Sequence, residues 1–270
     1  MRLLFTAVIF SSLLLIGCSQ DKFQDCGLEV IHFGYEYSTI QIGDQCWFQE
    51  NCRYVPFVSE DSDISDSDSK VYYYSNQQAF DSLRFGALYN FKATVNENLC
   101  PNGWRIPSDR DFKSLESSIG MSKNEVDGIN WRGDLSENLK YHQSIFYSLG
   151  ENITDSAIAL LNDGEILEEY YPNYTSKETD SAWSTYMDTS FYQFTSPVYL
   201  KGFSALPSGD MSQNGPENRF YSTGYWTSTQ GPIGTKSAYA RFLHHNENGV
   251  FRNTYKMSKG FSCRCMRDDL

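Results

Sequence analysis

The clearest structural signal in this chain is the stretch Pro107-Ser108-Asp109-Arg110-Asp111-Phe112-Lys113-Ser114-Leu115-Glu116-Ser117-Ser118-Ile119-Gly120. Ser108 stands three residues before Asp111, which is the spacing of a capping box at the start of a helix. Apolar residues then recur at helical spacing, at Phe112, Leu115 and Ile119. Gly120 is a typical residue just beyond a helix end. The stretch therefore predicts a helix over residues 108–119.

Short runs of β-forming residues lie on both sides of this helix, most of them bounded by Gly, Pro or Asn. The runs are 29–33, 38–42 and 46–48 before the helix, and 224–229, 237–243, 249–252 and 260–266 after it. A weaker helical pattern falls within residues 76–85. We therefore expect a β-rich α+β domain whose N-terminal and C-terminal strands pair.

The composition of the 270 residues is that of a globular protein, with 40% hydrophobic and 16% aromatic residues. The chain has 22 Lys and Arg against 34 Asp and Glu, so its formal net charge is -12. Polyanions are bound by clustered Lys and Arg side chains. The charge therefore argues against nucleic acid and anionic membrane surfaces as partners.

The N-terminal residues have the pattern of an export signal. Arg2 precedes an apolar stretch, Leu3–Ile16, that is short for a membrane span. The stretch ends in Leu-Ile-Gly-Cys at Cys18, which resembles a bacterial lipoprotein signal, where cleavage occurs before the Cys and lipid is attached to it. We expect residues 1–17 to be removed, Cys18 to carry lipid and 18–27 to form a tether. The alternative is an ordinary secretory peptide, which would leave Cys18 as an odd thiol.

Six cysteines remain after this removal. They are Cys26, Cys46, Cys52, Cys100, Cys263 and Cys265. An even number in an exported chain favours three disulfides, for which about fifteen pairings exist. No Cys-x-x-Cys pair occurs, and the four histidines lack zinc-finger spacing relative to the cysteines. No metal site is therefore predicted.

Residues 59–69 form an acidic and serine-rich stretch, Ser-Glu-Asp-Ser-Asp-Ile-Ser-Asp-Ser-Asp-Ser. A stretch with a single apolar residue cannot contribute to a core, so it predicts an exposed, mobile loop. Its acids invite a calcium interpretation. An EF-hand loop, however, requires a Gly near its middle, and this stretch contains none.

Five sequence blocks follow one another along the chain. They are TIQIGDQCWFQEN (39–51), LCPNGWRIPSD (99–109), GFSALPSG (202–209), YWTST (225–229) and GFSCRCMRD (260–268). Together they resemble the Fibrobacter succinogenes major paralogous domain, a family of exported and often lipid-anchored bacterial proteins. The resemblance implies one domain over 28–270, with insertions near 55–75 and 136–200. It also implies a C-type-lectin-like fold with two helices, short antiparallel sheets and long loops.

The blocks suggest roles for several of their residues. Cys100 and Cys265 both lie in family-type blocks, near the second helix and the last strand, so they are predicted to pair. Cys26, Cys46, Cys52 and Cys263 would then form the other two bridges. The tryptophans Trp47, Trp104 and Trp226 are expected to pack in the core. The arginines Arg105, Arg241, Arg252 and Arg264 are expected to pair with acids or carbonyls.

The sequence points to binding and not to catalysis. It contains no GxGxxG, GxxxxGK[ST], HExxH or GxSxG motif. The calcium-dependent sugar motifs of true C-type lectins are also absent. We expect a lipoprotein of the bacterial outer membrane, exposed at the cell surface or, as the alternative, on the periplasmic side, that binds a glycan or protein partner without a cofactor. Its predicted ligand loop is 207–223, with Asp210, Asn214, Glu217, Asn218 and Tyr221.

Two other functions remain open at this point. The protein could be a structural or assembly component of an outer-membrane complex, without a soluble ligand. It could also be a thiol-dependent oxidase, because the lectin-like fold also carries formylglycine-generating enzymes. Cys263 and Cys265 would lie on one face of a strand, which suits that second alternative.

Overall fold

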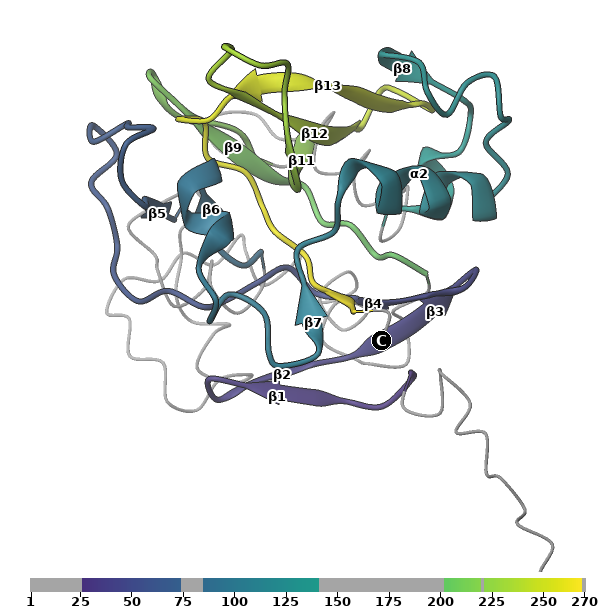
Figure 1. The fold of residues 1–270 in the computed structure, drawn as a ribbon, viewed down its shortest axis with the longest axis horizontal. Coiled ribbons are helices and arrows are strands. Elements are labelled where there is room, and N and C mark those ends of the chain that lie inside the picture. The colour runs from purple at the N-terminus through teal and green to yellow at the C-terminus, as the bar shows by residue number, and fades with distance from the viewer. Residues whose placement is uncertain (1–25, 74–84, 141–201, 220, 269–270) are drawn as a thin grey trace, which may run out of the picture.

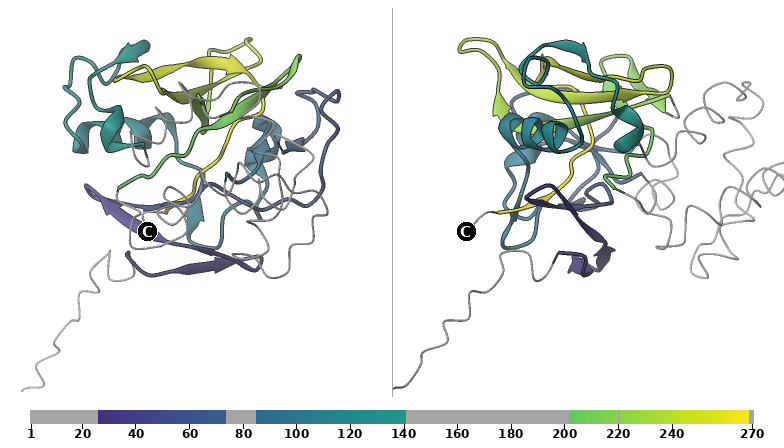
Figure 2. Two further views of the ribbon diagram at one scale, coloured as in Figure 1. Left: turned by 180° about the vertical axis from the view of Figure 1, so that it is seen from behind. Right: turned by 90° about the vertical axis from the view of Figure 1, so that its right-hand side faces the viewer.

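The computed structural model describes residues 26–73, 85–140, 202–219 and 221–268 (Figures 1 and 2). Within these ranges α2 (Asp109–Ser118) is the only α-helix, and η1 (Phe91–Val95) and η2 (Ser136–Asn138) are short 3-10 helices. None of the helices described is long and apolar enough to cross a membrane. The strands are β1 (Val30–His32), β2 (Tyr35–Tyr37), β3 (Thr39–Ile42), β4 (Gln45–Phe48), β5 (Val71–Tyr72), β6 (Leu88–Tyr89), β7 (Trp104–Arg105), β8 (Asn130–Arg132), β9 (Ser208–Ser212), β10 (Gly215–Arg219), β11 (Ser222–Gln230), β12 (Ser237–His244), β13 (Val250–Lys256) and β14 (Met266–Arg267).

The strands form two larger sheets and two strand pairs. The larger sheet has the order β10-β9-β11-β12-β13-β8, and a four-stranded sheet has the order β3-β4-β14-β7. The remaining strands pair as β1-β2 and β5-β6. In Figure 1 the six-stranded sheet lies at the top, the four-stranded sheet lies below it, and the β1-β2 hairpin is at the bottom.

The predicted α+β fold with two helices in a C-type-lectin-like arrangement is wrong. Most of the regular secondary structure in the described residues is strand, and it includes one α-helix. The long loop region expected after residue 207 instead forms β9 and β10, which extend the six-stranded sheet. The helical pattern at 76–85 lies almost entirely outside the described residues, as does most of the insertion expected at 136–200. The N-terminal and C-terminal strands do pair, with Met266 of β14 opposite Trp47 of β4.

The helix α2 begins and ends where its sequence predicts. Ser108 is the N-cap: its Oγ accepts a hydrogen bond from the Asp111 backbone N–H at 3.2 Å, and the Asp111 carboxylate accepts one from the Ser108 N–H at 2.6 Å. This is the reciprocal pair of a capping box. Gly120, with φ of +114°, follows the helix end at Ile119. Phe112 and Leu115 are buried in a core cluster shared with both larger sheets.

Buried ion pairs hold the other face of α2 against the six-stranded sheet. Asp109 accepts hydrogen bonds from Arg241 Nη1, Arg252 Nε and Arg252 Nη2, each at 2.8 Å. Two turns later Glu116 accepts one from Arg241 Nε at 2.6 Å and two from Arg132, at 3.0 and 2.9 Å. All five residues are at most 7% exposed. We call them the arginine clamp, because the two buried carboxylates of the helix are bound by arginines from the strands β8, β12 and β13.

Candidate functional site

The last sequence block joins the two larger sheets in the centre of the molecule. On one side the Cys263 and Cys265 carbonyls accept hydrogen bonds from the N–H groups of Cys52, at 2.8 Å, and Phe48, at 3.0 Å. On the other side Ser262 exchanges backbone hydrogen bonds with β11, to Gly224 at 2.9 Å and from Trp226 at 3.1 Å. The block therefore runs between the two sheets, and side chains from distant parts of the chain converge on it.

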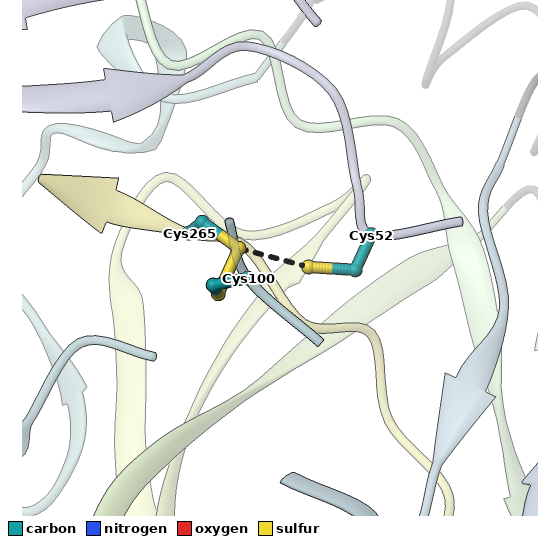
Figure 3. Close-up of side chains that lie close together, drawn as sticks. All are labelled: Cys52, Cys100 and Cys265. Atoms are coloured by element: carbon teal, nitrogen blue, oxygen red, sulfur yellow. Dashed lines mark hydrogen bonds between the residues drawn. A yellow bond between two sulfur atoms is a disulfide. The ribbon is translucent and has the colours of Figure 1, made fainter. Parts of the chain in front are cut away.

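Three sulfur atoms meet beside this block (Figure 3). Cys100 and Cys265 form a disulfide, as predicted, and the Cys52 Sγ lies 3.5 Å from the Cys265 Sγ. All three sulfurs lie within 4.8 Å of one another. Cys26 and Cys46 form a second disulfide. The expected third bridge is absent from the described residues, because Cys52 and Cys263 are both free thiols in the core.

Burial keeps both free thiols protonated. It raises the pKa of Cys52 to about 12, although the nearby charge of Arg264 acts in the opposite direction. Burial also raises the pKa of Cys263 well above its ordinary value. The thiolate is the nucleophile and the metal ligand, and almost none is present at neutral pH with such pKa values. Of the three clustered sulfurs, only that of Cys52 is outside a disulfide and able to act as a ligand.

Arg264 occupies the opposite face of the same block. Its guanidinium is 1% exposed and donates to the Asn51 Oδ1 at 2.6 Å, the Tyr225 hydroxyl at 3.2 Å and the Phe203 carbonyl. It also lies 4.2 Å from the centre of the Phe203 ring. These partners are neutral, and burial lowers the pKa of Arg264. The arrangement confirms that Arg264 pairs with carbonyls, and it ties the 202–205 segment to the core.

The other expected packing roles can be compared with the structure. Trp47 and Trp226 are completely buried, and Trp104 is half-buried against Phe48. Arg105 forms ion pairs with Asp111 at 2.6 Å and Asp268 at 2.8 Å. Arg241 and Arg252 bind Asp109 in the arginine clamp. These residues hold the fold together, and none of them is free to bind a ligand.

The predicted ligand residues lie on and after the β9-β10 hairpin. Asp210 is buried and bound by Asn218 Nδ2 at 2.7 Å and Lys259 Nζ at 2.9 Å. Asn214 Nδ2 donates to Glu217 at 3.1 Å. Tyr221 lies beyond the end of β10, with its ring 5.2 Å from that of His245. The structure thus brings four of the five residues together, but they bind one another.

A polar groove opens beside the tip of this hairpin, with a volume of about 590 Å³. The acidic stretch, the β9-β10 turn, the β11-β12 turn and the end of β13 supply its lining: Ile64, Ser65, Asp66, Gln213, Thr235, Lys236, Ser237, Lys256 and Ser258. Lys236 and Asp66 form an ion pair at 3.2 Å across it. Lys256 forms no ion pair with any described residue. Sequence reasoning missed the groove, because its residues come from four separate segments.

The acidic stretch is held in place beside this groove. Asn90 Nδ2 donates to the Ser65 and Asp68 carbonyls at 2.8 and 2.7 Å, and Lys70 forms an ion pair with Asp68 at 3.5 Å. No helix or strand forms within residues 59–69, so the predicted exposed loop is confirmed. The loop therefore presents a fixed wall to the groove.

Comparison with known proteins adds a family. Residues 40–267 match the family model of the Fibrobacter succinogenes major domain. No curated protein and no solved structure matches the chain.

Proposed function

The chain belongs to the Fibrobacter succinogenes major domain family, and we propose that this member is a lipid-anchored outer-membrane protein that binds an acidic glycan at the cell surface. It catalyses no reaction. The anchor is the lipid on Cys18, and the ligand occupies the polar groove. The thiol-oxidase alternative is disfavoured, because burial raises the pKa of Cys52 and Cys263 and leaves almost no reactive thiolate.

The sequence at Cys18 supports the anchor. Its Leu-Ile-Gly-Cys ending follows an apolar stretch of the right length for an export signal. The two disulfides suit an oxidising compartment outside the cytoplasm. A short polar segment before Cys26 then separates the lipid from the first bridge.

The composition of the groove is the observation that carries the ligand proposal. Four hydroxyl groups and one carboxamide line it, and such groups donate and accept hydrogen bonds with sugar hydroxyls. Two lysines face one aspartate there, in a chain whose net charge is -12. Lys236 is paired with Asp66, so Lys256 is the lining cation that is left to bind a carboxylate or sulfate group of a ligand.

A glycan array with the mature protein tests this proposal. We expect acidic glycans to bind above background and neutral glycans of the same backbone to bind more weakly. The double variant Lys236→Ala/Lys256→Ala should lose at least about tenfold in affinity, which corresponds to about 1.4 kcal/mol. The matched control Lys92→Ala/Lys123→Ala removes two exposed lysines outside the groove and should bind like the wild type.

Two results would contradict the proposal. The first is an array on which no acidic glycan binds above background. The second is an equal loss of binding in the groove variant and its control. If no glycan binds and a stoichiometric outer-membrane partner co-purifies with the protein, the assembly alternative is correct.

A further inference from the structure

Large apolar side chains are exposed unevenly on this molecule. The described residues include nine of them, at Leu28, Ile31, Phe33, Phe57, Val58, Val95, Ile129, Trp131 and Ile233. The first three lie on or directly before the β1-β2 hairpin, with 59%, 73% and 57% of their surfaces exposed. Phe57 and Val58 follow Tyr54, whose ring contacts Phe33 at 4.5 Å. Five of the nine exposed residues thus belong to this end of the molecule or to a segment that touches it.

The hairpin turn presents an aromatic ring at a conformational cost. Phe33 and Gly34 both have positive φ values, of 49° and 80°. The first central position of such a turn is usually Asn, Asp or Gly, since a bulky side chain is strained there. Strained residues of this kind concentrate at functional positions. Packing alone does not explain a strained Phe with 57% of its surface in solvent.

The predicted lipid lies close to this hairpin along the chain. The Cys26–Cys46 disulfide fixes the start of the described chain to β4, and Cys18 precedes Cys26 by eight residues. Eight residues span at most about 28 Å when fully extended. A lipid on Cys18 would therefore keep the hairpin side of the domain next to the membrane.

The groove lies on the opposite side of the molecule. In Figures 1 and 2 the β1-β2 hairpin forms one extremity, whereas the β9-β10 hairpin and the end of β13 lie at the other. With the hairpin toward the membrane, the groove faces away from it. This one orientation places the hairpin at the membrane and leaves the groove accessible to a ligand, and a surface receptor requires both.

We propose that the β1-β2 hairpin inserts Ile31 and Phe33 into the lipid surface that holds Cys18. This inference rests on the proposed lipid anchor. Glu29 and Glu36 flank Ile31, and their negative charges are not attracted to anionic headgroups. The proposed contact with the membrane is therefore apolar. Electrostatic attraction to the membrane is not needed, because the segment between the lipid on Cys18 and Cys26 holds the hairpin at the membrane interface. A hairpin inserted in this way lies at the boundary between headgroups and acyl chains.

Fluorescence quenching by brominated phosphatidylcholine tests the insertion. The full-length lipoprotein is reconstituted into vesicles as wild type, Phe33→Trp, Ile31→Trp and Ile233→Trp. Ile233 is the matched control, because it is fully exposed in the turn between β11 and β12, at the far end of the molecule. We expect brominated lipid to quench most of the emission added at positions 31 and 33 and none of that added at 233.

The outcomes separate this inference from the anchor. Intact mass and vesicle flotation show first whether Cys18 carries lipid. Protein without lipid at Cys18 overturns the anchor and the inference together. Lipidated protein whose added indoles at 31 and 33 are not quenched, or are quenched no more than at 233, overturns the inference alone. Using two positions guards against a local defect in one variant.

Discussion

Replacing Asp109 with Asn should destabilise the fold more than any change of similar size on the surface. Asp109 is 7% exposed and accepts three charge-assisted hydrogen bonds, each at 2.8 Å, from Arg241 and Arg252. The amide of Asn is nearly isosteric, but it carries no charge and directs an NH₂ group at one set of guanidinium donors. The three buried guanidinium groups of the arginine clamp would then have the single carboxylate of Glu116 as their counterion.

The cost follows from the loss of a buried counterion. Breaking a buried ion pair by neutralising one partner costs about 3–5 kcal/mol, because it leaves an uncompensated charge in the core. Three hydrogen bonds to charged groups are affected, each worth about 1.5–3 kcal/mol, which agrees with a loss of several kcal/mol. We therefore expect Asp109→Asn to lower the free energy of unfolding by about 4 kcal/mol.

Urea unfolding followed by tryptophan fluorescence measures this loss. Asp127→Asn is the control, because Asp127 is exposed and binds Lys113 at the edge of the same network. It should leave the free energy of unfolding close to that of the wild type. A loss below about 1 kcal/mol for Asp109→Asn, with an unchanged urea dependence, would refute the view that the clamp holds α2 in place.

Four further predictions concern acid, the helix cap, the disulfides and the free thiol of Cys52. Burial would raise the pKa of Asp109, but hydrogen bonds and charge from Arg252 and Arg241 outweigh it and lower that pKa. Its stabilisation is therefore complete above the ordinary carboxyl pKa and is lost progressively as the pH falls below about 4. Acid should thus destabilise the wild type more steeply than Asp109→Asn in urea titrations. Ser108→Ala should cost about 1 kcal/mol in the same assay, and a change within error would contradict the capping role. Opening the Cys100–Cys265 bridge, which closes a 165-residue loop, should lower the free energy of unfolding by about 5 kcal/mol through loop entropy. Opening the Cys26–Cys46 bridge, which closes a 20-residue loop, should lower it by about 3 kcal/mol. Equal losses for the two bridges would contradict this ranking. Cys52 should react with a thiol reagent at pH 8 only after denaturation, and rapid labelling of the native protein would contradict its burial.

Local patterns predicted local structure well. The helix α2 was found from its cap and its apolar spacing, since both signals lie within a few residues of each other. Most β-forming runs also became strands. The hairpin of β9 and β10 was missed because its residues are polar and do not alternate, and because β10 contains Pro216 and Asn218. The pairing of β9 and β10 with each other, and of β9 with β11, makes these segments strands.

Long-range pairing was harder to predict. Arg241 and Arg252 lie 132 and 143 residues from Asp109, and nothing in a single sequence assigns partners at that separation. The third disulfide was inferred from the even number of cysteines. Cys52 and Cys263 are instead buried among apolar side chains, where a thiol behaves as a small hydrophobic group.

The most direct test of this account is the intact mass of the protein extracted from membranes. Free thiols are alkylated in denaturant without reduction before the measurement. The account predicts a 253-residue chain that begins at Cys18 after loss of residues 1–17 of 270, carries lipid and gains two alkyl groups, at Cys52 and Cys263. A chain that keeps residues 1–17, lacks lipid, or gains no alkyl groups or more than two would contradict it.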